Sequence, residues 1–256
     1  MYVNIFFLLA SNPFFDAYTH SDFLGKLIFI GLIGLSIISW IILLHKGWIT
    51  YYARKHSVQF HAFFQLQKSN PLSLDCEQAI LQASPSPFLD LYAILKKQTI
   101  DLLNKNRRFR AAAQAEGATE SAMSYLSPSD IEFVDTYLMS AIANQTKQLE
   151  KNLFILSTVV ALGPFLGLLG TVWGILTTFS ELQANSMSSA NQAVLGGLSL
   201  ALATTVLGLL DAIPALIGYN YLKNTISSFE VDMEGFSTEI LAAVEMQYRK
   251  VDIQYE

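Results

Sequence analysis

"LFILSTVVALGPFLGLLGTVWGILTTF", residues Leu153–Phe179, is the stretch that decides the fold. It contains 27 residues and no charged side chain. About 20 apolar residues suffice to cross the roughly 30 Å hydrocarbon core of a bilayer, so the sequence predicts a membrane-spanning helix with length to spare. Glycine occupies four of the twelve positions from Gly163 to Gly174. Small residues let helix backbones approach closely in a membrane, so this helix is predicted to pack tightly against another.

Two further stretches are long and apolar enough to span a membrane, Phe23–Leu44 and Val194–Tyr219. Each contains one charged side chain, Lys26 near the start of the first and Asp211 inside the second. The whole chain is 52% hydrophobic and 14% charged, whereas soluble domains carry about 25% charged residues. The composition therefore predicts an all-α membrane protein with three transmembrane helices.

The orientation of the spans follows from the positions of Lys and Arg. Residues 1–25 and 180–193 contain none, residues 46–152 contain twelve, and residues 220–256 contain three. Basic loops stay in the cytoplasm, so the N-terminus is predicted to lie outside and the C-terminus inside. The predicted order is a periplasmic N-terminus (1–22), transmembrane helix 1 (23–44), a cytoplasmic helical domain (45–152), helix 2 (153–179), a periplasmic loop (180–193), helix 3 (194–219) and a cytoplasmic C-terminal helix (220–256).

The cytoplasmic segments are predicted to be mostly extensions of the membrane helices. His45–Leu66 continues the first span, and breakers delimit two shorter helices at Leu74–Gln82 and Phe88–Asn104. "SPSD" begins a helix with Ser127 as N-cap and proline at the first helical position. No breaker follows, which predicts one helix from Pro128 to about Phe179 unless Pro164 kinks it. In the tail, apolar residues recur at helical spacing: Phe229, Met233, Phe236, Ile240, Val244 and Tyr248.

Several classes of function find no support in the sequence. The net charge of −5 and the lack of an Arg/aromatic patch exclude a nucleic-acid-binding surface. Cys76 is the only cysteine, and the four histidines have no metal-ligand spacing; they are His20, His45, His56 and His61. No catalytic or cofactor-binding motif occurs. "KNRRFR", Lys105–Arg110, indicates either an anion- or lipid-binding patch or a solvated basic turn.

Small residues form a thin stripe on each of the second and third spans. On the second span the stripe is Gly163, Gly167, Gly170, Gly174 and Thr178, with Thr171 at its edge. On the third it is Gly197, Ala201, Thr204, Gly208, Asp211 and Ala215, with Thr205 beside it. The stripes are predicted to pack against each other or against those of other copies of the chain.

The polar side chains on these faces have two interpretations. A threonine hydroxyl often bonds to its own helix, which is expected for Ser157, Thr158, Thr177 and Thr178. Alternatively, hydroxyls such as Thr171 and Thr205 line a polar path near the middle of the membrane. Asp211 belongs either to an ion pathway, as intramembrane acids commonly do, or to a structural cap.

These segments resemble a known family. "GPFLGLLGTVWGILTTF" and "GGLSLALATTVLGLLDAIPALIGYN" (Gly196–Asn220) are similar to the second and third helices of the MotA/TolQ/ExbB proton-channel family. "LSIISWIILL" in the first span and "LEKNLFIL" before the second resemble the TolQ branch most. The similarity covers the three spans and their flanks in order, whereas residues 60–125 match only in length and helical character.

The resemblance implies an inner-membrane homo-oligomer, a pentamer in this family, which faces membrane lipid and whose second and third helices line a pore. It implies a TolR-like partner with one membrane helix and a membrane Asp, and a TolA-like protein that spans the periplasm. Thr171 and Thr205 match the family's pore threonines, with Thr204 beside them, and Pro164 and Pro214 match its helix prolines. The alternatives are an ExbB-like role in nutrient uptake and a scaffold that conducts nothing.

One position departs from the family pattern. Members of the TolQ and ExbB branch carry a Glu five residues before the third-helix threonine, where this chain has Leu200. An acid stands instead at Asp211, eleven residues later. Eleven residues make about three helical turns, so both positions share one face. The hypothesis is that Asp211 supplies the missing intramembrane carboxylate.

Overall fold

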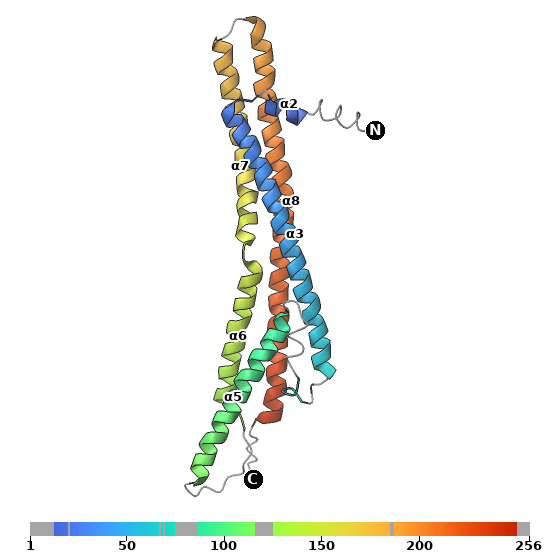
Figure 1. Cartoon of the computed structure of the whole chain (residues 1–256), viewed down its shortest axis with the longest axis vertical. Helices are drawn as coiled ribbons and strands as arrows, with labels where there is room; N and C mark the ends of the chain where they lie inside the picture. The colour runs from blue at the N-terminus through green and yellow to red at the C-terminus, as the bar shows by residue number, and fades with distance from the viewer. Residues whose placement is uncertain are drawn as a thin grey trace, which may run out of the picture. The chain divides into compact units, whose positions relative to one another are not determined.

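The computed structural model is almost entirely helical. It describes residues 13–19, 21–66, 68, 70–74, 86–115, 125–184 and 187–249. Its elements are α2 (Pro13–Thr19), α3 (Phe23–Leu66), α5 (Pro87–Ala115), α6 (Pro128–Glu150), α7 (Leu153–Ala184) and α8 (Met187–Tyr248) (Figure 1). Three stretches, in α3, in α6–α7 and in α8, are long and apolar enough to cross a membrane, which confirms the predicted fold class.

Most predicted helix boundaries agree with the structure, and three differ. α3 runs to Leu66 and α8 to Tyr248, so both helices extend beyond their spans as expected. The segment 180–193, predicted as a loop between two spans, is partly helical: α7 continues to Ala184 and α8 starts at Met187. α5 passes through Lys105–Arg110, so this basic run is helical and not a turn. Cys76, His20 and most of the helix predicted at 74–82 lie outside the described residues.

The third difference is a break in the long helix predicted from Pro128 to Phe179. α6 begins as expected, because Ser127 and Asp130 form a reciprocal capping box. It ends at Glu150, however, and Asn152 adopts a φ of 72° before α7 starts. Asparagine is one of the few residues that tolerate this left-handed conformation. Pro164 does not interrupt α7, so the break occurs at Asn152 and not at the proline.

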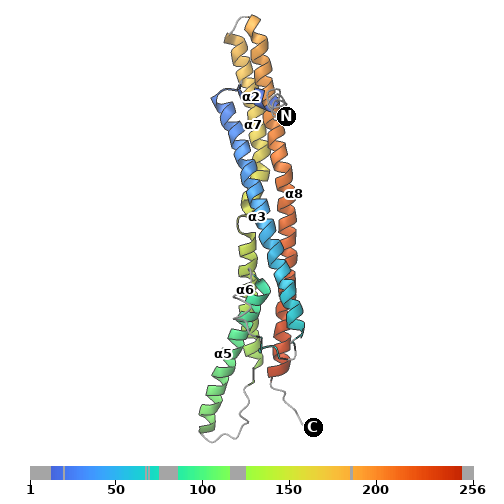
Figure 2. The ribbon, with the colours of Figure 1, turned by 45° about the vertical axis from the view of Figure 1, so that its right-hand side comes forward.

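The chain divides into two compact units. Unit 1 comprises Met1–Lys46 with Asn152–Lys223, and unit 2 comprises Gly47–Lys151 with Asn224–Glu256. In unit 1, α7 and the first half of α8 run side by side with the first part of α3 (Figures 1 and 2). α2 is held there by a small cluster in which Ala17 packs with Phe29 and Ala203.

Unit 2 has an aromatic core. The ring of Phe88 on α5 stacks on that of Phe236 on α8 with centroids 4.4 Å apart, and on Phe229 at 5.9 Å. Phe60 and Phe64 from α3 complete the cluster through contacts with Tyr92 and Phe236. The apolar residues that recur at helical spacing in the tail lie on α8 as predicted. Tyr248 is half-buried, and the others are at most 2% exposed: Phe229, Met233, Phe236, Ile240 and Val244.

Candidate functional site

The small-residue stripes of α7 and α8 face each other within one chain. A Cβ atom added at Gly163 would lie 3.0 Å from the backbone oxygen of Gly208, and one at Gly174 would lie 2.7 Å from that of Gly197. Between them, the added Cβ of Gly170 would overlap the side chain of Thr204. The glycines therefore allow backbone-to-backbone contact along several turns, and this settles one alternative: the stripes pack on each other.

The C-terminal end of the α8 stripe differs from the prediction. The stripe predicted from the sequence contains Asp211, but the residue that meets α7 there is Ala212, whose Cβ lies 3.5 Å from a Cβ added at Gly163. At the N-terminal end of the stripe, Gly197 meets Thr178. Ala201 and Gly208 are buried in this contact, whereas the side chains of Pro164 and Pro214 are exposed and half-buried respectively.

The threonine hydroxyls near the contact bond to helix carbonyls. Thr171 Oγ1 donates to Leu168 O at 2.7 Å on its own helix, and its side chain is half-buried at the edge of the contact. Thr205 Oγ1 lies 3.2 Å from Gly167 O of α7, so its hydroxyl can link the two helices. Thr204 is fully buried, with its hydroxyl 3.0 Å from Leu200 O and Ala201 O. Thr171 and Thr205, unlike Thr204, therefore retain part of their surface at the edge of the α7–α8 pair.

The same bonding to the helix is confirmed for the other threonines of α7. Thr158 donates to Phe154 O at 2.8 Å, and Thr177 and Thr178 both donate to Gly174 O, at 3.0 and 2.7 Å.

Leu200 and Asp211 both lie against α3, as their eleven-residue spacing predicts. A Cβ added at Gly25 would lie 2.7 Å from Leu200 Cδ2. Asp211 is 5% exposed, and its Oδ1 lies 3.3 Å from the hydroxyl of Ser39. Its Oδ2 has no hydrogen-bond partner. In this chain α8 thus presents one face to α7 and another to α3, and the acid lies on the α3 side.

A polar link between the start of α3 and α7 is absent from the sequence-based predictions. Trp173 Nε1 donates to Asp22 Oδ2 at 2.7 Å, and the other carboxylate oxygen of Asp22 accepts the backbone N–H of Gly25 at 2.9 Å. Asp22 therefore caps the start of α3 and joins it to α7. The sequence signal was an acid just before a helical run, which could have been recognised as an N-cap.

Unit 2 holds the main network of charged side chains. Glu239 on α8 accepts from Lys68 at 2.8 Å and from Gln65 at 2.6 Å, and lies 2.8 Å from His61 Nε2. The hydrogen bond from Lys68 is the main reason why the pKa of Glu239 falls from 4.5 to about 2. His61, one of the four histidines without metal-ligand spacing, thus contacts Glu239. Within the described ranges no group of His, Cys, Asp and Glu is arranged to hold a metal.

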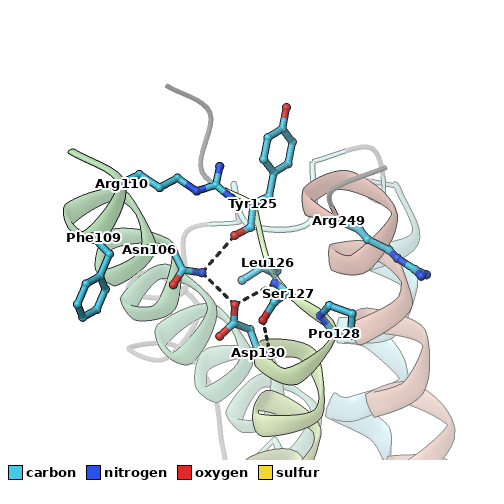
Figure 3. A pocket seen from close by; sticks show the side chains of 9 residues that line it. All are labelled: Asn106, Phe109, Arg110, Tyr125, Leu126, Ser127, Pro128, Asp130 and Arg249. Atoms are coloured by element: carbon cyan, nitrogen blue, oxygen red, sulfur yellow. Dashed lines mark hydrogen bonds between the residues drawn. The ribbon is translucent and has the colours of Figure 1, made fainter. Parts of the chain in front are cut away.

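A polar cavity of about 430 Å³ lies where the end of α5 meets the start of α6 (Figure 3). Asn106, which lines the cavity, donates hydrogen bonds from Nδ2 to Tyr125 O at 3.2 Å and to Asp130 Oδ2 at 2.9 Å. Burial raises the pKa of Asp130, but hydrogen bonds from Ser127 and Asn106 outweigh it and hold the pKa below its usual value. Arg110 lies over the Tyr125 ring, 5.5 Å from its centroid. The two hydrogen bonds of Asn106 thus join α5 to the start of α6.

Comparison with known proteins identifies the family. Residues 105–235, about half of the chain, match the model of the MotA/TolQ/ExbB proton channel family. The chain belongs to this family. The matched region contains both stripes, the threonines and Asp211, which are the features that form the α7–α8 and α3–α8 contacts.

Individual relatives carry two names. The chain is 37% identical over 127 residues to "Biopolymer transport protein ExbB" of Xanthomonas campestris, and this alignment spans about half of each protein (50% and 49%). It is 27% identical to the ExbB of Salmonella typhimurium, over 92% of this chain and 86% of that one. It is 26% identical to "Tol-Pal system protein TolQ" of Haemophilus influenzae, over 94% and 97%.

Together, these findings establish the general class of the protein. It is a multi-pass protein of the bacterial inner membrane, of the Tol or Exb type. Its family is one of proton channels and not a class of enzymes.

Proposed function

We propose that this chain is the pore-forming subunit of a Tol-type complex that uses the proton-motive force. In this proposal the N-terminus is periplasmic, the C-terminus is cytoplasmic, and several copies, five by analogy with the family, surround a central path. A TolR-like protein with one membrane helix and a membrane Asp occupies the path. Proton flow then drives a TolA-like protein that spans the periplasm, in support of envelope integrity, cell division or protein import.

The observation that carries the proposal is the arrangement of hydroxyls at the edge of the α7–α8 contact. Thr205 can connect α8 to Gly167 O of α7, and Thr171 is half-buried beside it. A hydroxyl can accept a hydrogen bond while it donates to a helix carbonyl. Both threonines can therefore accept a hydrogen bond from a protonated carboxyl or a water on their exposed side. Thr204, which is fully buried, serves helix packing in this proposal.

The test compares two threonines on the same helix. Thr171→Ala should abolish proton flux through the complex reconstituted with its partner, while assembly into oligomers persists. Thr158 is the matched control, because it is an exposed threonine of α7 whose hydroxyl also donates to its own helix. Thr158→Ala should leave the flux unchanged. If Thr171→Ala conducts as well as the wild type, Thr171 does not belong to a proton path and the proposal fails. If the wild type with its partner carries no proton flux, the chain acts as a scaffold.

A second candidate, an ExbB-like role in outer-membrane nutrient uptake, is favoured by the identity to ExbB proteins over most of the chain. Complementation separates the two roles. A Tol-type protein should restore envelope integrity in cells that lack TolQ and not nutrient uptake in cells that lack ExbB. The opposite pattern would assign the chain to the Exb type.

A further inference from the structure

The contact between α3 and α8 contains a buried acid that the proposed pore does not use. Asp211 is 5% exposed in a single chain, before any second copy covers it. Ser39 of α3, itself 2% exposed, contacts Oδ1 through its hydroxyl, and the hydroxyl of Ser36, one turn earlier on α3, also interacts with the carboxyl. The second carboxyl oxygen, Oδ2, is buried without a partner. We infer that Asp211 and Ser39 form a proton-binding site inside each chain, between α3 and α8, and that Asp211 holds the proton.

Among the described residues, no ion pair neutralises an ionised Asp211. It is the only ionisable side chain among residues 27–44 of α3, 153–180 of α7 and 194–218 of α8. The next basic residues on α3, His45 and Lys46, follow Ser39 by six and seven positions, about 9–10 Å along the helix axis. An unpaired buried carboxylate costs several kcal/mol, whereas a protonated carboxyl carries no charge.

The geometry around Ser39 also allows Asp211 to hold the proton. The hydroxyl of Ser39 lies 3.0 Å from Ser36 O and 3.3 Å from Asp211 Oδ1. It has one hydrogen to donate, and Ser36 O can only accept. If that hydrogen goes to the nearer Ser36 O, the contact with Asp211 is a hydrogen bond only when Asp211 Oδ1 supplies the proton. The remaining Oδ2 is then a neutral carbonyl oxygen, for which the lack of a partner costs less than for a charged one.

Proton exchange at this site is coupled to the packing of α3. Release of the proton would place an uncompensated charge against α3, where Leu43 packs on Gly218 one to two turns further along. The ionised state therefore requires that water reach Asp211 or that α3 move away from it. This site is distinct from the α7–α8 edge, where Thr171 and Thr205 lie, and it exists whether or not the chain conducts protons.

Infrared spectroscopy of the full-length protein in membranes at neutral pH tests this inference. The difference spectrum between the wild type and Asp211→Asn should show the loss of a carbonyl band of a neutral carboxylic acid. Glu239→Gln is the matched control, because a glutamate with a pKa of about 2 is ionised at neutral pH. That variant should lose carboxylate bands only. If Asp211→Asn also loses carboxylate bands only, Asp211 is ionised and the inference is wrong.

A further variant and a further reagent complete the test. Ser39→Ala should shift the Asp211 band, because the acid loses its hydrogen-bond partner; an unshifted band would remove Ser39 from the site. Dicyclohexylcarbodiimide, which modifies protonated carboxyls in apolar surroundings, requires no variant. Mass spectrometry of the treated wild type should find the adduct on Asp211, less of it at alkaline pH. An adduct confined to other acids would contradict the inference. Neither measurement depends on proton flux, so the proposed function can fail separately.

Discussion

Gly208→Ala should destabilise the α7–α8 contact even though alanine is the better helix former. A Cβ atom at position 208 would lie 2.5 Å from Gly163 O, 3.2 Å from Gly163 C and 3.3 Å from the Cα of Gly167. All three neighbours belong to the backbone of α7, so no side chain can rotate away. Ordinary contact begins at 3.4 Å, and α7 would have to move by roughly 0.9 Å to restore it.

The expected change in the free energy of unfolding is the packing cost of the added methyl group minus the gain from replacing a helical glycine. Overpacking of a close contact costs about 1–3 kcal/mol, and a shift of 0.5–1 Å forfeits about a quarter to a half of the dispersion energy of each atom pair along the contact. Replacing a helical glycine with alanine gains about 0.5–1 kcal/mol. The net loss is therefore up to about 2.5 kcal/mol and centred near 1 kcal/mol, which corresponds to a fall in melting temperature of roughly 2–4 °C per kcal/mol for a chain of this size.

The assay is thermal unfolding of the purified full-length protein in detergent, followed by circular dichroism. Gly31→Ala is the matched control, because Gly31 lies in the span of α3 and a Cβ added there meets nothing within 4 Å. It should leave the melting temperature unchanged or raise it. If Gly208→Ala melts at or above the wild-type temperature, the backbones of α7 and α8 are not in the close contact that the structure shows, and the reasoning is refuted.

Three further predictions concern the ends and the charges of the helices. Asn152→Val should destabilise the protein by about 1–2 kcal/mol, because a β-branched residue is strained at positive φ, whereas Asn152→Gly should be tolerated; denaturant unfolding measures both. Ser127→Ala should lower the free energy of unfolding by about 1 kcal/mol, because α6 loses its N-cap. Ser127→Asp can still accept from the Asp130 N–H, so it should retain most of the wild-type stability in the same assay. Because the pKa of Glu239 is lowered to about 2 in the folded protein from 4.5, its stabilising contribution is complete above pH 4.5 and is lost as the pH falls toward 2. Glu239→Gln should remove that part of the acid dependence, and an unchanged acid-unfolding curve would show that the Lys68 contact contributes nothing.

The sequence predicted the helices well because apolar length and capping are local properties. The start of α6 at Pro128 follows from Ser127 and Asp130, which are three residues apart. The break at Asn152 was missed because asparagine occurs within helices as well as at their ends, and only tertiary packing selects the left-handed conformation. The helical ends at 180–184 and 187–193 were missed for a related reason: polar residues indicate a loop and an exposed helix equally well.

The site was predicted in part because periodicity indicates which residues share a face but not what that face contacts. Steps of three and four residues identified both glycine stripes, and the structure pairs them. The same steps assigned Asp211 to the α7 side, although successive positions 211 and 212 differ by only about 100° around the helix. Which of the two meets α7 depends on where α3 lies, and no local pattern contains that information.

The contacts of α8 show what replacing the family's glutamate with Leu200 changes in this chain. Position 200 lies against the start of α3 at Gly25, and Asp211 lies against Ser39 further along the same helix. A carboxyl at either position would therefore meet α3, while Thr205 faces the α7 edge. Moving the acid from 200 to 211 keeps it on that face and shifts it by about 16 Å along α8. In this chain Asp211 and the threonines of the proposed pore thus belong to different helix contacts, and α8 is the helix that both contacts share.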